Sequence, residues 1–300
     1  MGPVGIKRFN CFRQVSPVCC LLIACFIGIL LCKPAACAET KFPSSPKGKA
    51  AIGEYFDGEE FTYNIGFLWF KKAAIGKIGI YKQEKGLYKI TLQAETMGFI
   101  GFITKYRKDI YHAYAEEVEG GGRFRTKRFE KIVIIGDRTR HGFTDVDYNK
   151  RTYHWKSWGG GKDDKEAEES IPPGILYDDP LTGFYNFRFG VYGPIKEGKE
   201  YHVPTFPVKD VSTIYVKIAG EKEKAKRLNP GPADIGYIAD IVVDKEFFGS
   251  QTGNVEVHFT KETIPITAVA KDLILFGDVR GTLVEMTSKI GFRKTVSSKE

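Results

Sequence analysis

The chain has 300 residues and a mass of 33.7 kDa, with 45 Lys and Arg against 37 Asp and Glu, so its formal charge is +8. A composition of 42% hydrophobic and 27% charged residues is ordinary for a folded protein and excludes a largely disordered chain. The sequence has no Gly-X-Y period, no long heptad run and only one long apolar stretch, which excludes collagen, a coiled coil and a polytopic helical membrane protein.

The first 38 residues predict a secretory signal peptide. Lys7, Arg8 and Arg13 precede an apolar run at 18–32, and the small residues of Ala36-Cys37-Ala38 predict cleavage after Ala38. The run is shorter than the roughly 20 residues that span a bilayer. An uncleaved N-terminal membrane anchor and a lipidated cysteine are the alternatives. We therefore expect an exported protein of the periplasm or of the outer-membrane periphery.

Cleavage would also remove all six cysteines, which lie at positions 11 to 37. The mature chain would then have no disulfide, no cysteine nucleophile and no thiolate metal site. Four basic residues and no acidic residue precede the predicted cut, so the mature chain would carry 41 basic and 37 acidic residues, a net charge of +4. This small excess argues against a nucleic-acid partner.

Beyond the signal, residues 39–52 are predicted to be a mobile leader, residues 53–290 a single β domain, and residues 291–300 a tail. The domain consists of short runs of β-branched and aromatic residues that are separated by Gly, Asn and Asp, as in an antiparallel all-β protein. We expect a curved open sheet or an incomplete barrel. The predicted strands include 61–67, 75–81, 87–92, 99–106, 109–117, 123–129, 131–136, 152–158, 200–206, 213–219, 237–243, 254–260, 266–276 and 281–287.

Three segments depart from this pattern. Residues 159–169 combine glycine with mixed charge and predict an exposed loop, and residues 221–227 predict a solvated loop or hairpin. Residues 180–189 predict one short helix, since Asp178 or Asp179 can cap a helix whose first residue is Pro180. A helix in this position would cover an open sheet face or one end of a barrel.

Several of these segments together resemble one protein family. They are Gly53-Glu54-Tyr55-Phe56, the strands at 61–67 and 73–78, the Asp-Pro-Leu segment from Asp179 to Arg188, and the strand pair within 255–283. Their order resembles domain-of-unknown-function family 3108, which consists of exported bacterial proteins. The resemblance implies an exported all-β fold, by analogy with open barrels that carry lipoproteins or lipids. It implies no catalytic residue, because the family has no established activity.

The residues themselves give little support for catalysis. The five histidines lack metal-ligand spacing, and no serine-nucleophile, phosphate-loop or dinucleotide motif is present. Asp145 and Asp147 share one strand face and would suit a cation site or an acid–base pair, but they also flank a predicted hairpin at Asn149, which favours a structural role. We therefore predict a protein that is not an enzyme, with no catalytic residues, no metal and no cofactor.

The aromatic residues give the strongest functional signal. There are 40 of them, and many lie in apolar clusters with glycine. Core packing alone explains a large share of them, but an apolar inner sheet face that receives an acyl chain would also need them. The candidate ligand-binding residues are Trp69, Phe99, Phe102, Phe184, Tyr185 and Phe187.

The leading hypothesis is an exported envelope protein that binds a lipid, an acyl chain or an envelope partner without catalysing a reaction, and that associates peripherally with a membrane. One alternative is an integral outer-membrane β-barrel. Another is a hydrolase that uses Asp145, Asp147 or a histidine.

Overall fold

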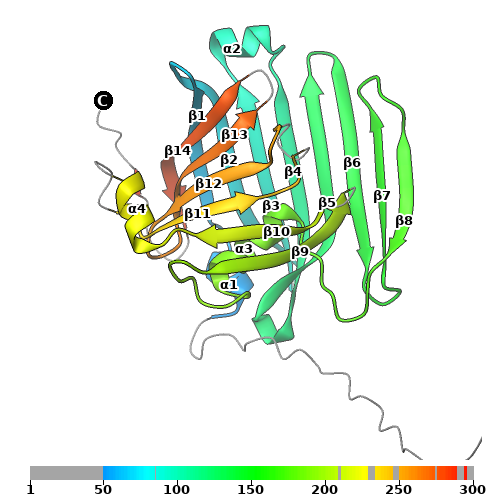
Figure 1. The fold of residues 1–300 in the computed structure, drawn as a ribbon. Helices are drawn as coiled ribbons and strands as arrows, with labels where there is room; N and C mark the ends of the chain where they lie inside the picture. The colour runs from blue at the N-terminus through cyan, green and yellow to red at the C-terminus, as the bar shows by residue number, and fades with distance from the viewer. Residues whose placement is uncertain are drawn as a thin grey trace, which may run out of the picture. The chain divides into compact units, whose positions relative to one another are not determined.

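A path of fourteen antiparallel strands runs through a single open sheet in the computed structural model of the protein (Figure 1). The structure describes residues 50–84, 86–208, 211–228, 234–245, 250–273, 276–288 and 294–295, all of which belong to one compact unit. The predicted signal peptide, its cleavage point and most of the predicted leader and tail lie outside these residues. The predicted fold class, an antiparallel open β sheet, is confirmed.

The sheet has two arms that meet at β1. The first arm runs outward from β1 to β8, and the second runs from β14 to β9, because β1 pairs with both β2 and β14. A short strand, β15, adds to β14. The first arm consists of β1 (Glu60–Phe67), β2 (Phe70–Glu84), β3 (Leu87–Thr96), β4 (Lys108–Val118), β5 (Arg123–Ile135), β6 (Arg138–Asp147), β7 (Thr152–Gly159) and β8 (Lys165–Ser170). The second arm consists of β9 (Glu200–Val208), β10 (Val211–Ile218), β11 (Tyr237–Val242), β12 (Asn254–Phe259), β13 (Pro265–Leu273) and β14 (Gly277–Thr287), followed by β15 (Lys294–Thr295).

One predicted strand is instead a helix. Residues 99–106 were expected to be extended, but Gly98–Ile103 form the short helix α2. Gly98 begins the helix with φ +55°, and the Thr104 hydroxyl closes it by donating a hydrogen bond to the Ile100 carbonyl oxygen at 2.7 Å. The run GFIGFI is apolar throughout, so its periodicity could not distinguish a strand from a short helix.

Two predicted loops contain regular structure. Strand β8 begins inside the segment 159–169 and pairs with β7, where Glu166 lies 2.8 Å from Lys156. Residues Glu221–Arg227 form the helix α4, in which Arg227 bonds to Glu223 one turn earlier and to Asp240 on β11. These ion pairs give both charged segments a partner that composition alone did not reveal. The remaining short helices are α1 (Ile52–Phe56) and the 3-10 turn η1 (Glu119–Gly121).

The predicted central helix is confirmed as α3 (Pro180–Phe189). Asp179 caps it, since its Oδ1 atom accepts hydrogen bonds from the backbone N–H groups of Leu181 at 2.9 Å and Thr182 at 3.1 Å. The helix ends at Gly190, whose φ of +89° is a conformation that favours glycine. A local signal at each end therefore determines where this helix begins and stops.

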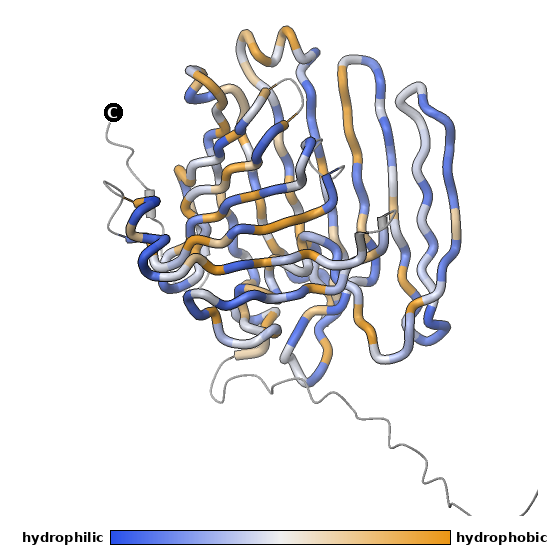
Figure 2. The backbone as a smooth tube through the Cα atoms, in the orientation of Figure 1, coloured by the Kyte–Doolittle hydropathy of each residue, from blue (hydrophilic) through white to orange (hydrophobic). Residues whose placement is uncertain are grey.

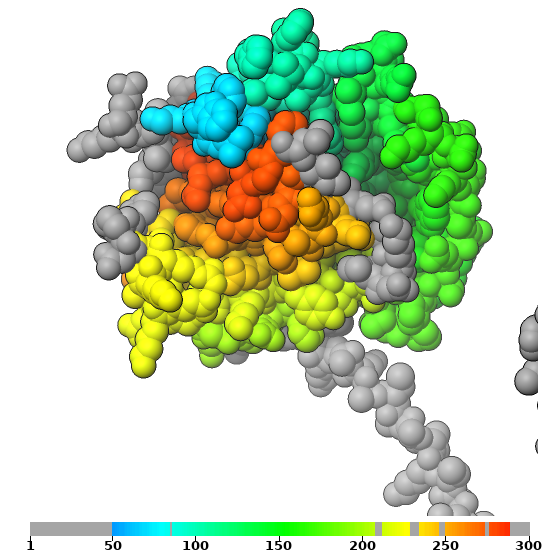
Figure 3. All heavy atoms as spheres, turned by 45° about the horizontal axis from the view of Figure 1, so that its top comes forward, coloured from blue at the N-terminus to red at the C-terminus, as the bar shows by residue number. Residues whose placement is uncertain are grey.

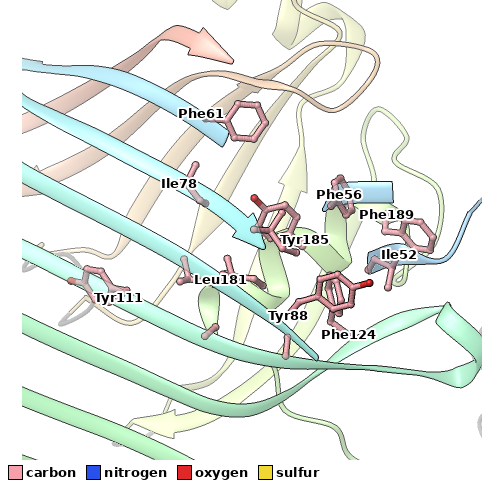
Figure 4. Packing of buried hydrophobic residues seen from close by; sticks show 14 of the residues in the cluster. Ile52, Phe56, Phe61, Ile78, Tyr88, Tyr111, Phe124, Leu181, Tyr185 and Phe189 are labelled. Carbon is pink, nitrogen blue, oxygen red and sulfur yellow. The ribbon is translucent and has the colours of Figure 1, made fainter. Parts of the chain in front are cut away.

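Helix α3 packs against both arms. Leu181, Tyr185 and Phe189 join the core of the first arm, which Figure 4 shows around Phe56. Phe187 belongs to a second cluster, which is built from β9 to β12. The helix thus holds the two arms together at one end of the molecule (Figure 1).

The Asp179 cap predicts a specific dependence of stability on pH. Burial, which outweighs the hydrogen bonds from Thr182 and Thr126, raises the pKa of Asp179 to about 6. Between about pH 4 and pH 6 the folded protein then holds a proton that the unfolded chain has released, so this carboxyl favours folding less as the pH rises. Asp179→Asn keeps a capping oxygen but does not titrate. The free energy of unfolding of the wild type, relative to this variant, is expected to fall by about 2 kcal/mol between pH 4 and pH 7.

Urea unfolding at intervals across this pH range measures the difference. The exposed Glu200, changed to Gln, is the control for surface titration. A difference between the wild type and Asp179→Asn that stays constant with pH would contradict the prediction.

Candidate functional site

A cavity of about 660 Å³ lies between the two arms of the sheet and above α3. Its walls are almost entirely apolar and come from strands of both arms. From the first arm they include Tyr63, Ile65, Ile78, Leu92 and Tyr111; from the second they include Ile214, Val216, Val255, Val257 and Ala268.

The cavity exists because small residues occupy inward-facing positions of neighbouring strands. Gly76 on β2 lies opposite Ala94 on β3, and Gly281 on β14 lies opposite Ala268 on β13. Since alternate strand residues share a face, larger side chains at the two alanine positions would project into the interior. At Gly76 the Ile65 side chain already occupies the adjacent space, because its Cδ1 atom would lie 2.9 Å from an added Cβ atom. A Cβ atom added to Gly281 would make ordinary van der Waals contacts at 3.8 Å with Tyr63 and Ala268, so a methyl group would fit there without a clash.

Helix α3 closes one end of the cavity. Leu181, Phe184 and Phe187 line the cavity there, while Tyr185 points away into the core of the first arm, 5.0 Å from the Phe56 ring. Tyr185 is fully buried. The helix therefore uses one side as the floor of the cavity and another to attach itself to the sheet.

The floor is held in place by a buried ion pair. Arg188, on α3, bonds to both carboxylate oxygens of Glu59 at 2.6 and 2.9 Å, and its Nε atom donates to the Thr263 carbonyl oxygen at 2.8 Å. Four aromatic rings lie 4.8 to 5.4 Å from the guanidinium: those of Phe56, Phe61, Phe184 and Tyr185. Burial opposes the charge, but the Glu59 carboxylate raises the pKa of Arg188, so the guanidinium stays charged.

Polar groups are a minority in the lining, and several of them already have partners. Arg107 and Asp109 line the cavity at the α2 end. The Arg107 guanidinium donates two hydrogen bonds to the Asp109 carboxylate, at 2.8 and 3.0 Å. The Tyr63 hydroxyl donates to the Pro265 carbonyl oxygen on the opposite arm at 2.8 Å, and burial raises the pKa of Tyr63 so that it stays protonated. Such a site offers mainly apolar contact to a ligand.

The six sequence-predicted ligand-binding residues occupy three different places. Phe184 and Phe187 line the cavity, and Tyr185 lies in the core behind it. Trp69, Phe99 and Phe102 do not line the cavity and are 78%, 67% and 70% exposed. Sequence reasoning missed the small wall residues, of which Ala94 and Ala268 are examples. The available signal was small residues at alternate positions of predicted strands.

The acidic pair considered for catalysis lies elsewhere and has structural partners. Asp145 accepts two hydrogen bonds, at 2.7 and 2.9 Å, from Arg128 on the neighbouring strand. Asp147 accepts the backbone N–H groups of Asn149 and Lys150, both at 3.0 Å, and these bonds, that of Lys150 foremost, lower its pKa. Neither residue lines the cavity. The described residues also contain no group of three His, Cys, Asp or Glu side chains placed to hold a metal ion.

Comparison with known proteins adds no relative. No family model, no curated protein and no solved structure matches this chain. The resemblance to domain-of-unknown-function family 3108 therefore stays a prediction. None of the helices that the structure describes has the length and apolar character needed to cross a bilayer.

The Arg188–Glu59 pair predicts a large loss of stability on substitution. Arg188→Met leaves the Glu59 carboxylate buried without its partner, which we expect to lower the free energy of unfolding by about 3–5 kcal/mol. Adding Glu59→Gln removes the stranded charge and should restore part of the loss. Urea unfolding of the three proteins measures both effects.

The exposed pair between Lys217 and Glu200 provides the control. Lys217→Met should change the free energy of unfolding by less than about 1 kcal/mol. A similarly small effect of Arg188→Met would show that the buried pair does not hold the floor.

Proposed function

We propose that this protein is a non-catalytic binder of a hydrophobic ligand, a lipid or another molecule with an acyl chain, and that the ligand occupies the cavity between the two arms. The single observation that carries the proposal is the size and apolar lining of this cavity. A volume of about 660 Å³ lies within the roughly 300–1,000 Å³ range of ligand-binding pockets.

The chemistry of the walls favours an acyl chain over a polar metabolite. Aliphatic and aromatic side chains form most of the lining. The charged groups of Arg107 and Asp109 bond to each other. A sugar or nucleotide would leave its hydroxyl and phosphate groups without partners, at a cost in desolvation. An acyl chain has no such groups, and each buried methylene would contribute about 0.8 kcal/mol before the cost of association.

The arrangement of the molecule also favours a binding role. The cavity lies between two arms that α3 joins at one end, so the interior is supported by the fold rather than by the ligand. The paired roles of Asp145 and Asp147 give no reason to invoke hydrolysis. Together with the predicted signal peptide, these features support a carrier or ligand-binding protein of the cell envelope.

Filling the cavity should weaken ligand binding without unfolding the protein. Ala94→Phe and Ala268→Phe each place a ring in the open space and should weaken the binding of dansyl-undecanoic acid, measured by fluorescence titration, by about tenfold or more. Thr91→Phe is the matched control, because Thr91 lies on the opposite face of the same strand as Ala94 and does not line the cavity.

Mass spectrometry of organic extracts from the purified protein tests for a native ligand. We expect co-purified lipid with the wild type and with Thr91→Phe, and much less with the two cavity variants. The proposal fails if the folded wild type neither carries lipid nor binds the fatty acid, or if the cavity variants bind it as tightly as the control does.

A further inference from the structure

The most exposed large hydrophobic side chains gather at one end of the molecule. We name this group the apolar rim; its exposed fractions run from 54% to 78%, the six highest among the large hydrophobic residues that the structure describes. Its members are Leu68, Trp69, Phe99, Phe102, Ile103 and Tyr106. Isolated exposed hydrophobics are normal, but a cluster of this kind marks an interaction surface.

The rim is formed by two segments that lie side by side. One is the turn between β1 and β2, and the other is α2 with the turn that follows it. The Met97 N–H, at the start of α2, donates to the Ala73 carbonyl oxygen of β2 at 2.8 Å. Figure 2 shows hydrophobic stretches in both segments, and Figure 3 shows the two segments next to each other at the top of the view.

Helix α2 turns its apolar residues outward, which the fold does not require. Ile100 is buried beneath the helix, whereas Phe99, Phe102 and Ile103 face away from the protein. A surface helix normally has polar residues on that side. Leu68 is equally unexpected at a turn, since its backbone has φ +49°, a conformation that suits Gly or Asn better.

The charges within the rim segments all have one sign. Segments 67–74 and 96–108 contain five basic residues and no acidic residue. Arg107 and Lys108 pair with Asp109 and Glu95. Lys71, Lys72 and Lys105 are exposed and form no ion pair among the described residues. The rim is therefore an apolar patch with uncompensated positive charge beside it.

The rim also adjoins the candidate binding cavity. Ile100 and Thr104, on the inner side of the α2 segment, line the cavity, while their neighbours Phe99 and Ile103 belong to the rim. Phe67, beside Leu68, lines the cavity as well. The rim thus borders the end of the cavity opposite α3.

We infer that the apolar rim is the surface through which this protein docks onto a bilayer that contains anionic phospholipid. Trp, Tyr and Phe favour the interfacial region of a bilayer, and lysines beside them attract anionic headgroups. Docking in this orientation brings the end of the cavity to the membrane, where an acyl chain could enter. The inference extends the proposed function, and each can fail separately.

A fluorescence experiment on the full chain tests the inference at Trp69 itself. The chain has three tryptophans, so Trp155→Phe with Trp158→Phe leaves Trp69 as the reporter. The matched control, Trp69→Phe, leaves Trp155 and Trp158 on β7, which lies three strands away from β4 in the sheet. Each protein is mixed with vesicles of brominated phosphatidylcholine, with or without phosphatidylglycerol, because bromine quenches only a tryptophan that enters the bilayer.

We expect quenching of Trp69 to be roughly threefold stronger than that of the control in vesicles containing phosphatidylglycerol, and to weaken as salt screens the lysines. Lys71→Glu, Lys72→Glu and Lys105→Glu together, or Phe99→Ser with Phe102→Ser, should remove it. Attachment through the apolar run at 18–32 alone would quench both reporters equally, and that result would overturn the inference. Absence of quenching would do the same and would point to a protein partner for the rim.

Binding of dansyl-undecanoic acid without vesicles separates the two proposals. If the fatty acid binds and Trp69 is not quenched, the docking surface is wrong and the proposed function stands. If Trp69 is quenched and the fatty acid does not bind, the docking surface stands and the proposed function is wrong.

Discussion

The buried ion pair between Arg188 and Glu59 joins parts of the chain that are far apart in the sequence. Glu59 immediately precedes β1, Arg188 lies in the last turn of α3, and Thr263, which also accepts from Arg188, follows β12. A guanidinium is suited to this position because its five donors can bind a carboxylate and a carbonyl group in one plane. Its flat faces also pack against the surrounding rings, so one side chain meets both the polar and the apolar demands of the site.

This attachment explains how a hollow interior is compatible with a stable fold. A cavity forgoes the packing contacts that would otherwise stabilise the arms. In this protein α3 supplies those contacts at one end, where Tyr185 and Phe187 enter different clusters. Small residues such as Ala94 and Ala268 can then leave the space beyond the helix open. One end of the arms therefore stabilises the fold, and the rest of their length encloses the cavity.

Local sequence signals predicted a large part of the fold. Asp179, Pro180 and Gly190 specify the ends of α3 through capping geometry, which involves only neighbouring residues. Alternation predicted most strands for the same reason. Helix α2 was missed because an entirely apolar run has no polar residue to mark its period.

The site was harder to predict because it depends on strand pairing. That Ala268 and Gly281 lie opposite each other, and that both face the same interior as Ala94, follows from the order of strands in the sheet. Aromatic content identified Phe184 and Phe187 as ligand-binding candidates, and both line the cavity. It could not separate them from Trp69, which lies in the turn between β1 and β2 and does not line the cavity. Which aromatic residues reach the cavity depends on the assembled sheet.

The pairing of β1 with β14 has a consequence for how the chain acquires its structure. Phe61 and Met286 are partners across this seam although about 225 residues separate them. Contacts of such long range form late and slowly during folding. Until the last strand has been made, β1 has an unsatisfied edge of the kind that recruits other chains into aggregates. A nascent or prematurely terminated polypeptide would therefore depend on chaperones until its final strand arrives.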